Sequence, residues 1–119
     1  MKPETEKWLK QAKKDIRAAN NSFNSRDYEW ACFQAHQATE KSLKALIIEK
    51  NSSLIKIHDL VLLAKKLSAP EDIRIKCSKI NPSYIDTRYP DVPKAYSEVD
   101  TIEIVKLAEE VISWIEKNL

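Results

Sequence analysis

Glycine is absent from all 119 positions of the sequence. This excludes the phosphate-cradling loops of the G-x-G-x-x-G and G-x-x-x-x-G-K-[ST] types, because no other residue lets the backbone approach a phosphate so closely. Tight β-hairpins also favour glycine at positive φ. The composition therefore disfavours a fold rich in β-structure.

Histidine and cysteine are scarce, with two of each. His36 and His58 fall on different predicted elements, and the sequence has no H-E-x-x-H or C-x-x-C pair, so we predict no metal site and no cofactor. Cys32 and Cys77 are too few for a disulfide framework, which is typical of the reducing cytoplasm. Because there is neither a long apolar run nor a signal-peptide core at the start, we expect no membrane span.

Length and charge are those of an ordinary domain. With no linker or break in composition, residues 1–119 are expected to form one domain. The net charge is +2 but uneven, because residues 1–66 carry 13 basic and 8 acidic side chains, and residues 67–119 carry 7 and 10. Two interpretations fit this pattern: solvated helix faces, or a basic patch for phosphates.

Apolar residues recur at helical spacing along most of the chain. They predict an all-α fold, an antiparallel up-and-down bundle of about five helices. We place these helices at about 4–23, 27–50, 58–67, 71–80 and from 100 or 101 to the C-terminus. From 81 to 99 no period is sustained, and two prolines disfavour helix at the residues before them. A long loop before the last helix is therefore expected.

The helix predicted over 27–50 is apolar on two sides. Small residues, including Ala31, Cys32 and Ala35, line its main stripe. Trp30, Phe33 and Ile48 lie on the opposite side. A helix of this kind either sits centrally in a bundle or contacts another subunit. We expect the three residues to lie in the interface of a two-fold homodimer.

The loop before the last helix combines aromatic rings with an arginine. Tyr84, Tyr89 and Tyr96 lie in or beside it, together with Arg88. Arginine offers a planar charged fork that matches phosphate, and tyrosine rings offer stacking surfaces for bases. In the alternative interpretation, Arg88 pairs with a carboxylate such as Glu40 and the tyrosines simply cover the bundle.

Three motifs follow one another along the chain. The first reads Tyr28-x-x-Ala31-x-Phe33-x-Ala35-x-Gln37-Ala38-x-Glu40-Lys41-x-Leu43-Lys44-Ala45. The second is Ile57-His58-Asp59-Leu60, and the third is Tyr84-Ile85-x-x-Arg88-Tyr89-Pro90-Asp91. In this order and spacing they resemble the HEPN family, the "higher eukaryotes and prokaryotes nucleotide-binding" domain, over nearly the whole chain.

The resemblance implies a helical bundle, commonly homodimeric, that binds nucleotides or RNA. It also implies a separately encoded minimal nucleotidyltransferase as a frequent partner. Many members of the family are metal-independent RNases that act as toxins, with an arginine followed four to six residues later by histidine. Here Pro93, Lys94 and Ala95 occupy those positions after Arg88, and no histidine follows His58. The usual nuclease pair is therefore missing. Metal-free cleavage needs a group that moves protons near neutral pH, and the histidine of that pair would be such a group.

We therefore predict a nucleotide- or RNA-binding module with no assigned catalytic residue. The expected ligand-binding residues combine the polar side of the second helix with the loop: Gln37, Lys41, Lys44, Tyr84, Arg88 and Tyr89. In this hypothesis Lys41 and Lys44 are exposed charges on one side of the helix. The alternative is a metal-independent RNase that uses Arg88, Tyr96 and His58.

Overall fold

A computed structural model describes residues 1–51, 53–90 and 95–119. Within these ranges it is helical and contains no strand. The helices are α1 (Pro3–Asn24), α2 (Tyr28–Asn51), α3 (Leu60–Lys66), α4 (Glu71–Ile80), the four-residue α5 (Ser83–Asp86) and α6 (Glu98–Lys117). The predicted all-α bundle is confirmed, with α5 as a short addition inside the expected loop.

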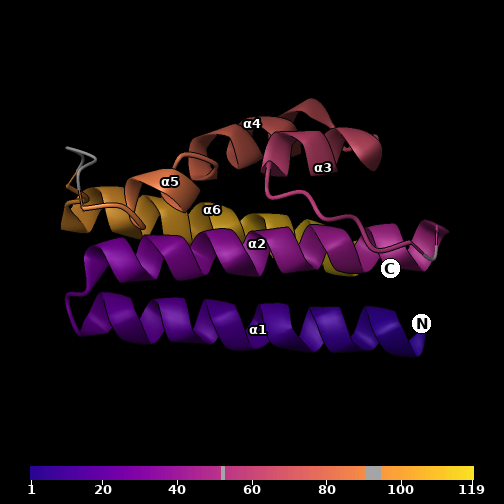
Figure 1. The fold of residues 1–119 in the computed structure, drawn as a ribbon, viewed down its shortest axis with the longest axis horizontal. Coiled ribbons are helices and arrows are strands. Elements are labelled where there is room, and N and C mark those ends of the chain that lie inside the picture. The colour runs from indigo at the N-terminus through magenta and orange to yellow at the C-terminus, as the bar shows by residue number, and fades with distance from the viewer. Residues whose placement is uncertain (52, 91–94) are drawn as a thin grey trace.

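Helix α2 lies at the centre of the bundle and contacts each of the other helices. Figure 1 shows α1 on one side of α2 and α3, α4 and α5 on the other, with α6 alongside α2. The segment from α3 to α5 leads back from the end where α2 finishes to the end where α6 begins. This central position explains why α2 is apolar on two sides.

Small side chains allow α1 and α2 to pack closely. Ala12 and Ala19 of α1, and Ala31 and Ala35 of α2, are fully buried. The free ends of the pair are joined by Glu49, whose carboxylate accepts hydrogen bonds from the Lys2 backbone N–H and the Thr5 hydroxyl, both at 2.9 Å. The ranges predicted from helical spacing, 4–23 and 27–50, agree with the observed ends of α1 and α2 to within one residue.

Helices α1 and α3 end in the same way. In each, the residue after the C-cap has a positive φ, 65° at Arg26 and 52° at Ser68. The Asp27 N–H donates to the Ser22 carbonyl, and the Ala69 N–H donates to the Ala64 carbonyl. These bonds form Schellman motifs, which usually place glycine at the position of positive φ.

The start of α6 differs from the prediction. We expected it at Asp100 or Thr101, but the helix begins at Glu98 after the N-cap Ser97. The Ser97 hydroxyl accepts a hydrogen bond from the Asp100 N–H, and the Asp100 carboxylate accepts one from the Ser97 N–H. This reciprocal capping box supplies partners for two backbone groups and starts the helix one turn earlier.

The start of α3 also differs, by two residues. Asp59, and not His58, is the N-cap, and its carboxylate accepts hydrogen bonds from the backbone N–H groups of Val61 and Leu62. Asn81 donates to the same carboxylate and accepts from the Leu60 N–H, which ties α3 to the end of α4. Because Asp59 makes the cap, the imidazole of His58 remains available for other contacts.

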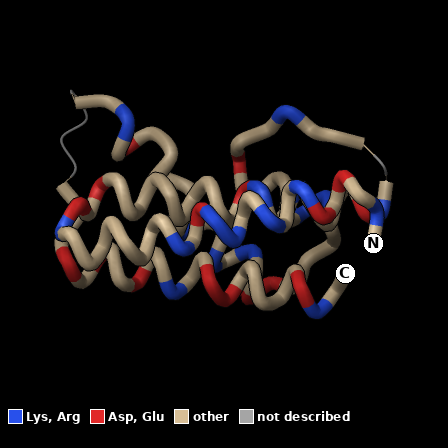
Figure 2. Tube along the Cα trace, turned by 90° about the horizontal axis from the view of Figure 1, so that it is seen from below, with Lys and Arg blue, Asp and Glu red and all other residues tan. Residues whose placement is uncertain are grey.

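Charged side chains of both signs are distributed along the outer helix faces. Figure 2 shows basic and acidic positions interspersed along the helices seen from below. Lys13 pairs with Glu116 at 2.7 Å, and Lys76 approaches Glu110 at 3.8 Å. This pattern favours solvated faces over one large basic patch. None of the helices in the described ranges combines the length and apolar character that crossing a membrane requires.

Candidate functional site

Arg88 lies two residues after α5, among three aromatic rings. Its guanidinium carbon is 4.5 Å from the centre of the Tyr84 ring, 5.6 Å from that of Tyr89 and 5.9 Å from that of Phe33 on α2. We call these four residues the Arg88 cluster. In the described part of the chain no carboxylate forms an ion pair with Arg88, whose side chain is exposed.

Two hydrogen bonds stabilise α5, one within its own turn and one to Tyr96, which precedes α6. The Thr87 hydroxyl donates to the Ser83 carbonyl at 2.6 Å, and the Tyr96 hydroxyl donates to the Asp86 carboxylate at 3.2 Å. Burial raises the pKa of Tyr96 to about 12, despite the opposing effect of its hydrogen bond with Ser83. Tyr96 therefore supports the loop and is a poor candidate for moving protons at neutral pH.

Four rings of the site form a continuous row, which we call the aromatic row. Trp30 stacks on Phe33 with ring centres 5.4 Å apart, and Phe33 lies 6.3 Å from Tyr84. His58 continues the row, because its ring stacks on Tyr84 at 4.8 Å with an angle of 16° between the planes. Trp30, at one end, is 55% exposed. The row therefore joins α2, the connector after it and α5.

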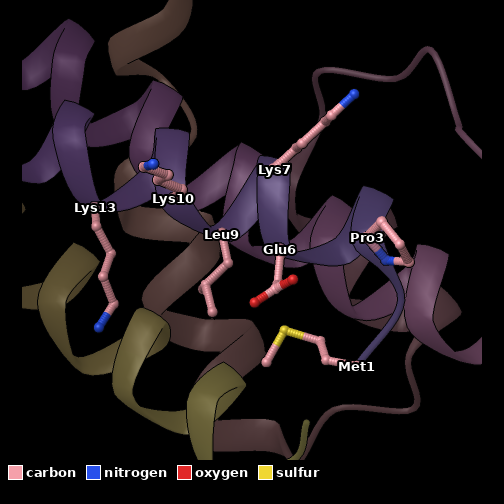
Figure 3. A pocket seen from close by; sticks show the side chains of 7 residues that line it. All are labelled: Met1, Pro3, Glu6, Lys7, Leu9, Lys10 and Lys13. Carbon is pink, nitrogen blue, oxygen red and sulfur yellow. The ribbon is translucent and has the colours of Figure 1, made fainter.

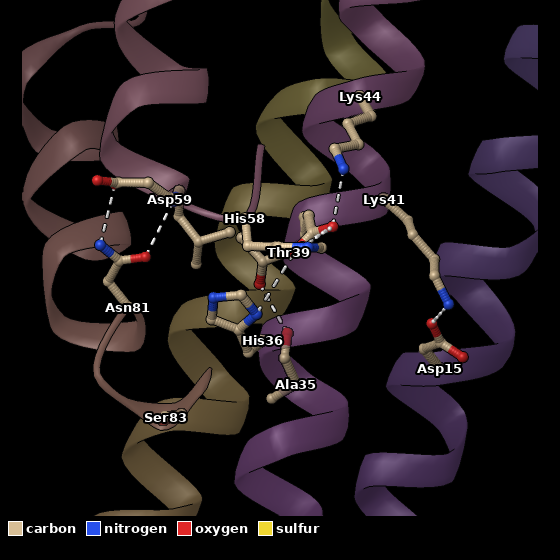
Figure 4. Close-up of polar contacts among 12 residues, drawn as sticks. Asp15, Ala35, His36, Thr39, Lys41, Lys44, His58, Asp59, Asn81 and Ser83 are labelled. Carbon is tan, nitrogen blue, oxygen red and sulfur yellow. Dashed lines mark hydrogen bonds and ion pairs between the residues drawn. The ribbon is translucent and has the colours of Figure 1, made fainter. Parts of the chain in front are cut away.

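Glu40 joins His58 to the buried part of α2 (Figure 4). Both of its carboxylate oxygens lie 3.1 Å from the His58 Nδ1. The Lys44 ammonium donates to the Glu40 Oε2 at 2.9 Å. Since the Glu40 and Lys44 side chains are each only 5% exposed, this is a buried ion pair that also holds an imidazole.

His36 lies beside this group, fully buried. Its Nδ1 is 3.9 Å from the nearest Glu40 oxygen, and among the described residues neither ring nitrogen has a hydrogen-bond partner. Burial lowers the pKa of His36, although the Glu40 carboxylate opposes the shift. His36 is therefore neutral at physiological pH.

The structure does not bring Lys41 and Lys44 to the loop as exposed charges. Lys41 points toward α1 and binds Asp15 at 2.6 Å (Figure 4). Lys44 is 4% exposed, pairs with Glu40 and lies 5.8 Å from the centre of the Trp8 ring. The prediction of a shared exposed face was wrong because both lysines find partners within the bundle.

Of the other predicted site residues, three lie in the Arg88 cluster and one does not. Tyr84, Arg88 and Tyr89 lie together in the Arg88 cluster. Gln37 is half-buried, and no hydrogen bond or ring contact in the described ranges joins it to the cluster. The proposed pair of Glu40 with Arg88 is not formed, since Glu40 binds Lys44 and His58 instead. Asp91 and Lys94 lie outside the described residues.

Two of the three residues predicted for a dimer interface remain accessible. Trp30 is exposed and Phe33 is half-buried. Ile48 is only 4% exposed, so the chain itself covers it and it cannot share an exposed patch with the other two. Sequence reasoning also missed that Phe33 contacts Arg88, since spacing along α2 says nothing about where α5 packs.

A separate hollow of about 530 Å³ lies at the N-terminal half of α1 (Figure 3). Its lining residues are Met1, Pro3, Glu6, Lys7, Leu9, Lys10 and Lys13. The hollow shares no residue with the Arg88 cluster. Within residues 1–51, 53–90 and 95–119, no three metal-ligating side chains converge on a point that could hold an ion.

Comparison with solved structures shows that the fold is shared. The chain is 30% identical to TT1696 from Thermus thermophilus, with a TM-score of 0.92 over 99% of this chain and 100% of that one. It is 29% identical to ST0689, an archaeal HEPN homologue, with a TM-score of 0.82 over 98% of each chain. An HEPN domain protein from Thermotoga maritima shares the fold at 23% identity, with a TM-score of 0.76 over 92% of this chain and 94% of that one.

A comparison with curated proteins gives no match. The family model for the HEPN domain matches residues 5–118. This range contains every residue of the Arg88 cluster and of the aromatic row. The chain therefore belongs to the HEPN domain family.

Proposed function

We propose that the protein is a nucleotide- or RNA-binding module and that Arg88 is its phosphate-binding residue. One observation carries this proposal: an exposed arginine lies against three aromatic rings, with no carboxylate partner in the described part of the chain. An arginine that has no internal ion pair is available for phosphate oxygens. Membership of a family named for nucleotide binding supports the same ligand class.

The rings position the guanidinium without using its hydrogen bonds. Aromatic faces attract the flat side of a guanidinium, so the N–H groups at its edge can still donate to a ligand. Tyr89 is 47% exposed. This ring can stack with a base, as aromatic side chains do in single-strand-binding proteins.

The proposal extends to partners. The resemblance implies a separately encoded minimal nucleotidyltransferase, and the exposed Trp30 favours association with a second copy of the chain. A neighbouring gene for such an enzyme, and its co-purification with this chain, would support the first partner. Failure of the two purified proteins to associate would remove the enzyme from the proposal.

Calorimetric titration with ATP and with single-stranded RNA tests the binding function. Arg88→Ala should weaken binding at least tenfold, by loss of charge-assisted hydrogen bonds, and should leave the urea unfolding midpoint almost unchanged. Arg17→Ala, an exposed arginine of α1, is the matched control and should bind as the wild type does. Binding should weaken as salt rises. If neither ligand binds, or if Arg88→Ala unfolds the domain, the proposed function is wrong.

Metal-independent RNA cleavage is the second candidate function. Its favouring observation is that His58 and Arg88 contact the same Tyr84 ring. Cleavage requires one proton to leave the 2′-oxygen and another to reach the leaving oxygen. His58 has an exposed imidazole in the aromatic row, whereas His36 is buried. Since Tyr96 is buried, we expect no cleavage of single-stranded RNA in EDTA. Cleavage that Arg88→Ala and His58→Asn both abolish would favour the RNase.

A further inference from the structure

We propose that His58 is a second phosphate-binding residue of this site and that it binds an internucleotide phosphate together with a proton. The inference rests on the proposed function, because it extends the phosphate site at Arg88. It concerns single-stranded RNA, whose backbone phosphates carry one negative charge each. Four contacts of described residues carry it.

The first contact fixes which nitrogen of His58 faces outward. The His58 Nδ1 lies 3.1 Å from both oxygens of Glu40. A carboxylate can only accept a hydrogen bond, so Nδ1 carries the hydrogen in the neutral ring as well as in the charged one. In the described part of the chain Nε2 has no hydrogen-bond partner, and the side chain is 55% exposed. Nε2 is therefore the nitrogen that can face a ligand.

The second contact holds the carboxylate in place. Glu40 is 4% exposed and is bound by the Lys44 ammonium at 2.9 Å. Lys44 in turn is buried and lies against the Trp8 ring. A buried ion pair that loses a partner is strongly destabilised, so Glu40 cannot easily turn away from this position. Its hydrogen bond to His58 is consequently a fixed feature of the fold.

The third and fourth contacts place His58 and the arginine against the same ring. The His58 ring stacks on Tyr84 with centres 4.8 Å apart, and the Arg88 guanidinium carbon lies 4.5 Å from the centre of the same ring. Glu40 holds the edge of the imidazole while Tyr84 holds its face. The outward nitrogen and the guanidinium therefore belong to side chains that contact one aromatic ring, and phosphates of one RNA strand can accept hydrogen bonds from each.

The surrounding charges couple the proton to the phosphate. Around His58 lie Glu40, His36 and Lys44 from α2 and Tyr84 from α5, with Asp59 adjacent in the sequence and Arg88 beyond the Tyr84 ring. Burial lowers the pKa of His36, so His36 adds no positive charge. A proton at Nε2 does add one, beside the pair of Glu40 and Lys44. A bound phosphodiester offsets that charge, and by linkage its binding draws the proton in.

Calorimetry in buffers of different ionisation enthalpy tests this coupling directly. The probe is an oligouridylate, because neither its phosphodiesters nor its bases titrate between pH 6 and 8. The wild type should take up a fraction of a proton on binding at pH 7, and its affinity should rise as pH falls, by at most about tenfold per pH unit for one proton. His58→Asn should bind more weakly and take up no proton.

Nitrogen NMR of the histidine rings provides a second readout that does not depend on a variant. On addition of the oligouridylate, the Nε2 resonance of His58 should move toward the protonated position, while Nδ1 stays protonated throughout. The His36 resonances should show no such change. These changes distinguish a His58 that binds phosphate from a His58 that only supports the loop.

The outcomes separate the two proposals. If the wild type binds, Arg88→Ala does not, and no proton is taken up, then the role of His58 is wrong while the proposed function stands. The same conclusion follows if His58→Asn keeps the proton uptake of the wild type. If the wild type does not bind the oligouridylate at all, the role of His58 is wrong, and the proposed function is overturned as well only if ATP also fails to bind.

Discussion

Two groups of cations in this molecule have opposite surroundings. On α2, Lys41 forms an ion pair with Asp15 at 2.6 Å, and Lys44 forms one with Glu40 at 2.9 Å. Arg88, after α5, contacts the rings of Tyr84, Tyr89 and Phe33. The comparison shows that the availability of a charge depends on its neighbours and not on its presence in a motif. The lysines pair with carboxylates inside the bundle, whereas the arginine has no such partner in the described part of the chain.

Replacing Lys44 is expected to have the largest effect on stability. Lys44→Ala removes one partner of a buried pair and leaves the Glu40 carboxylate with a half-exposed imidazole as its remaining partner. A loss of about 3–5 kcal/mol in the free energy of unfolding is expected, measured by urea denaturation. Lys106→Ala, an exposed lysine of α6, is the control and should change little. A loss below about 1 kcal/mol for Lys44→Ala would mean that the pair is not structural.

Negative charge introduced at the exposed end of the aromatic row should weaken the proposed homodimer. The double variant Trp30→Glu and Phe33→Glu should shift the light-scattering mass of the proposed homodimer to that of a monomer, because interface aromatic residues each contribute about 2 kcal/mol or more when they are hot spots. Leu62→Glu, at an exposed position of α3, should leave the mass unchanged. A wild-type protein that is monomeric at micromolar concentrations would rule out this interface.

The buried His36 should make the fold less stable in mild acid. Its pKa in the folded protein is below the usual value of 6.5, because burial disfavours the charged ring. As pH falls below 6.5 the unfolded chain takes up a proton that the folded chain does not, so stability decreases by at most about 1.4 kcal/mol per pH unit until the folded pKa is reached. Urea unfolding at pH 7.5 and 5.5 measures this loss.

His36→Gln is the matched control for that measurement, since glutamine does not titrate. The variant should lose less stability than the wild type between the two pH values, whatever its stability at pH 7.5. Glu49 does not interfere, because hydrogen bonds led by that of the Lys2 backbone N–H lower its pKa from 4.5, below the pH range used. Equal losses in the two proteins would contradict a neutral His36.

Replacing Lys41 should have the smallest effect. The ion pair with Asp15 joins α2 to α1, but both side chains remain partly exposed, at 24% and 18%. Such pairs contribute about 0.2–1 kcal/mol. Lys41→Ala should therefore lower the urea midpoint slightly and leave RNA binding unchanged. Loss of RNA binding in Lys41→Ala would return this lysine to the ligand site.

Hydrophobic periodicity was sufficient for the fold. It placed α4 at the observed residues, and it missed the start of α6 because the reciprocal pair of Ser97 and Asp100 was not recognised as a capping box. The four-residue α5 is too short for a period to show. Local sequence rules therefore account for both the success and the error.

The site was predictable only where its residues are neighbours in the sequence. Tyr84, Arg88 and Tyr89 lie together because one short segment carries them. Phe33 and His58 join them through the packing of α5 and the connector on α2, which no local pattern encodes. The burial of Lys44 had a readable signal, since Glu40 stands four residues before it and this spacing favours an ion pair.

Arg26 and Ser68 have positive φ angles, which glycine adopts more easily than other residues do. The absence of glycine therefore affects the stability of the fold at these two positions. A side chain in the left-handed region costs about 1–2 kcal/mol, and glycine avoids this cost although it has more conformational entropy to lose on folding. Arg26→Gly and Ser68→Gly are each expected to raise the unfolding free energy or leave it unchanged. The protein can thus be stabilised by substitution at two helix ends, away from the residues proposed to bind a ligand.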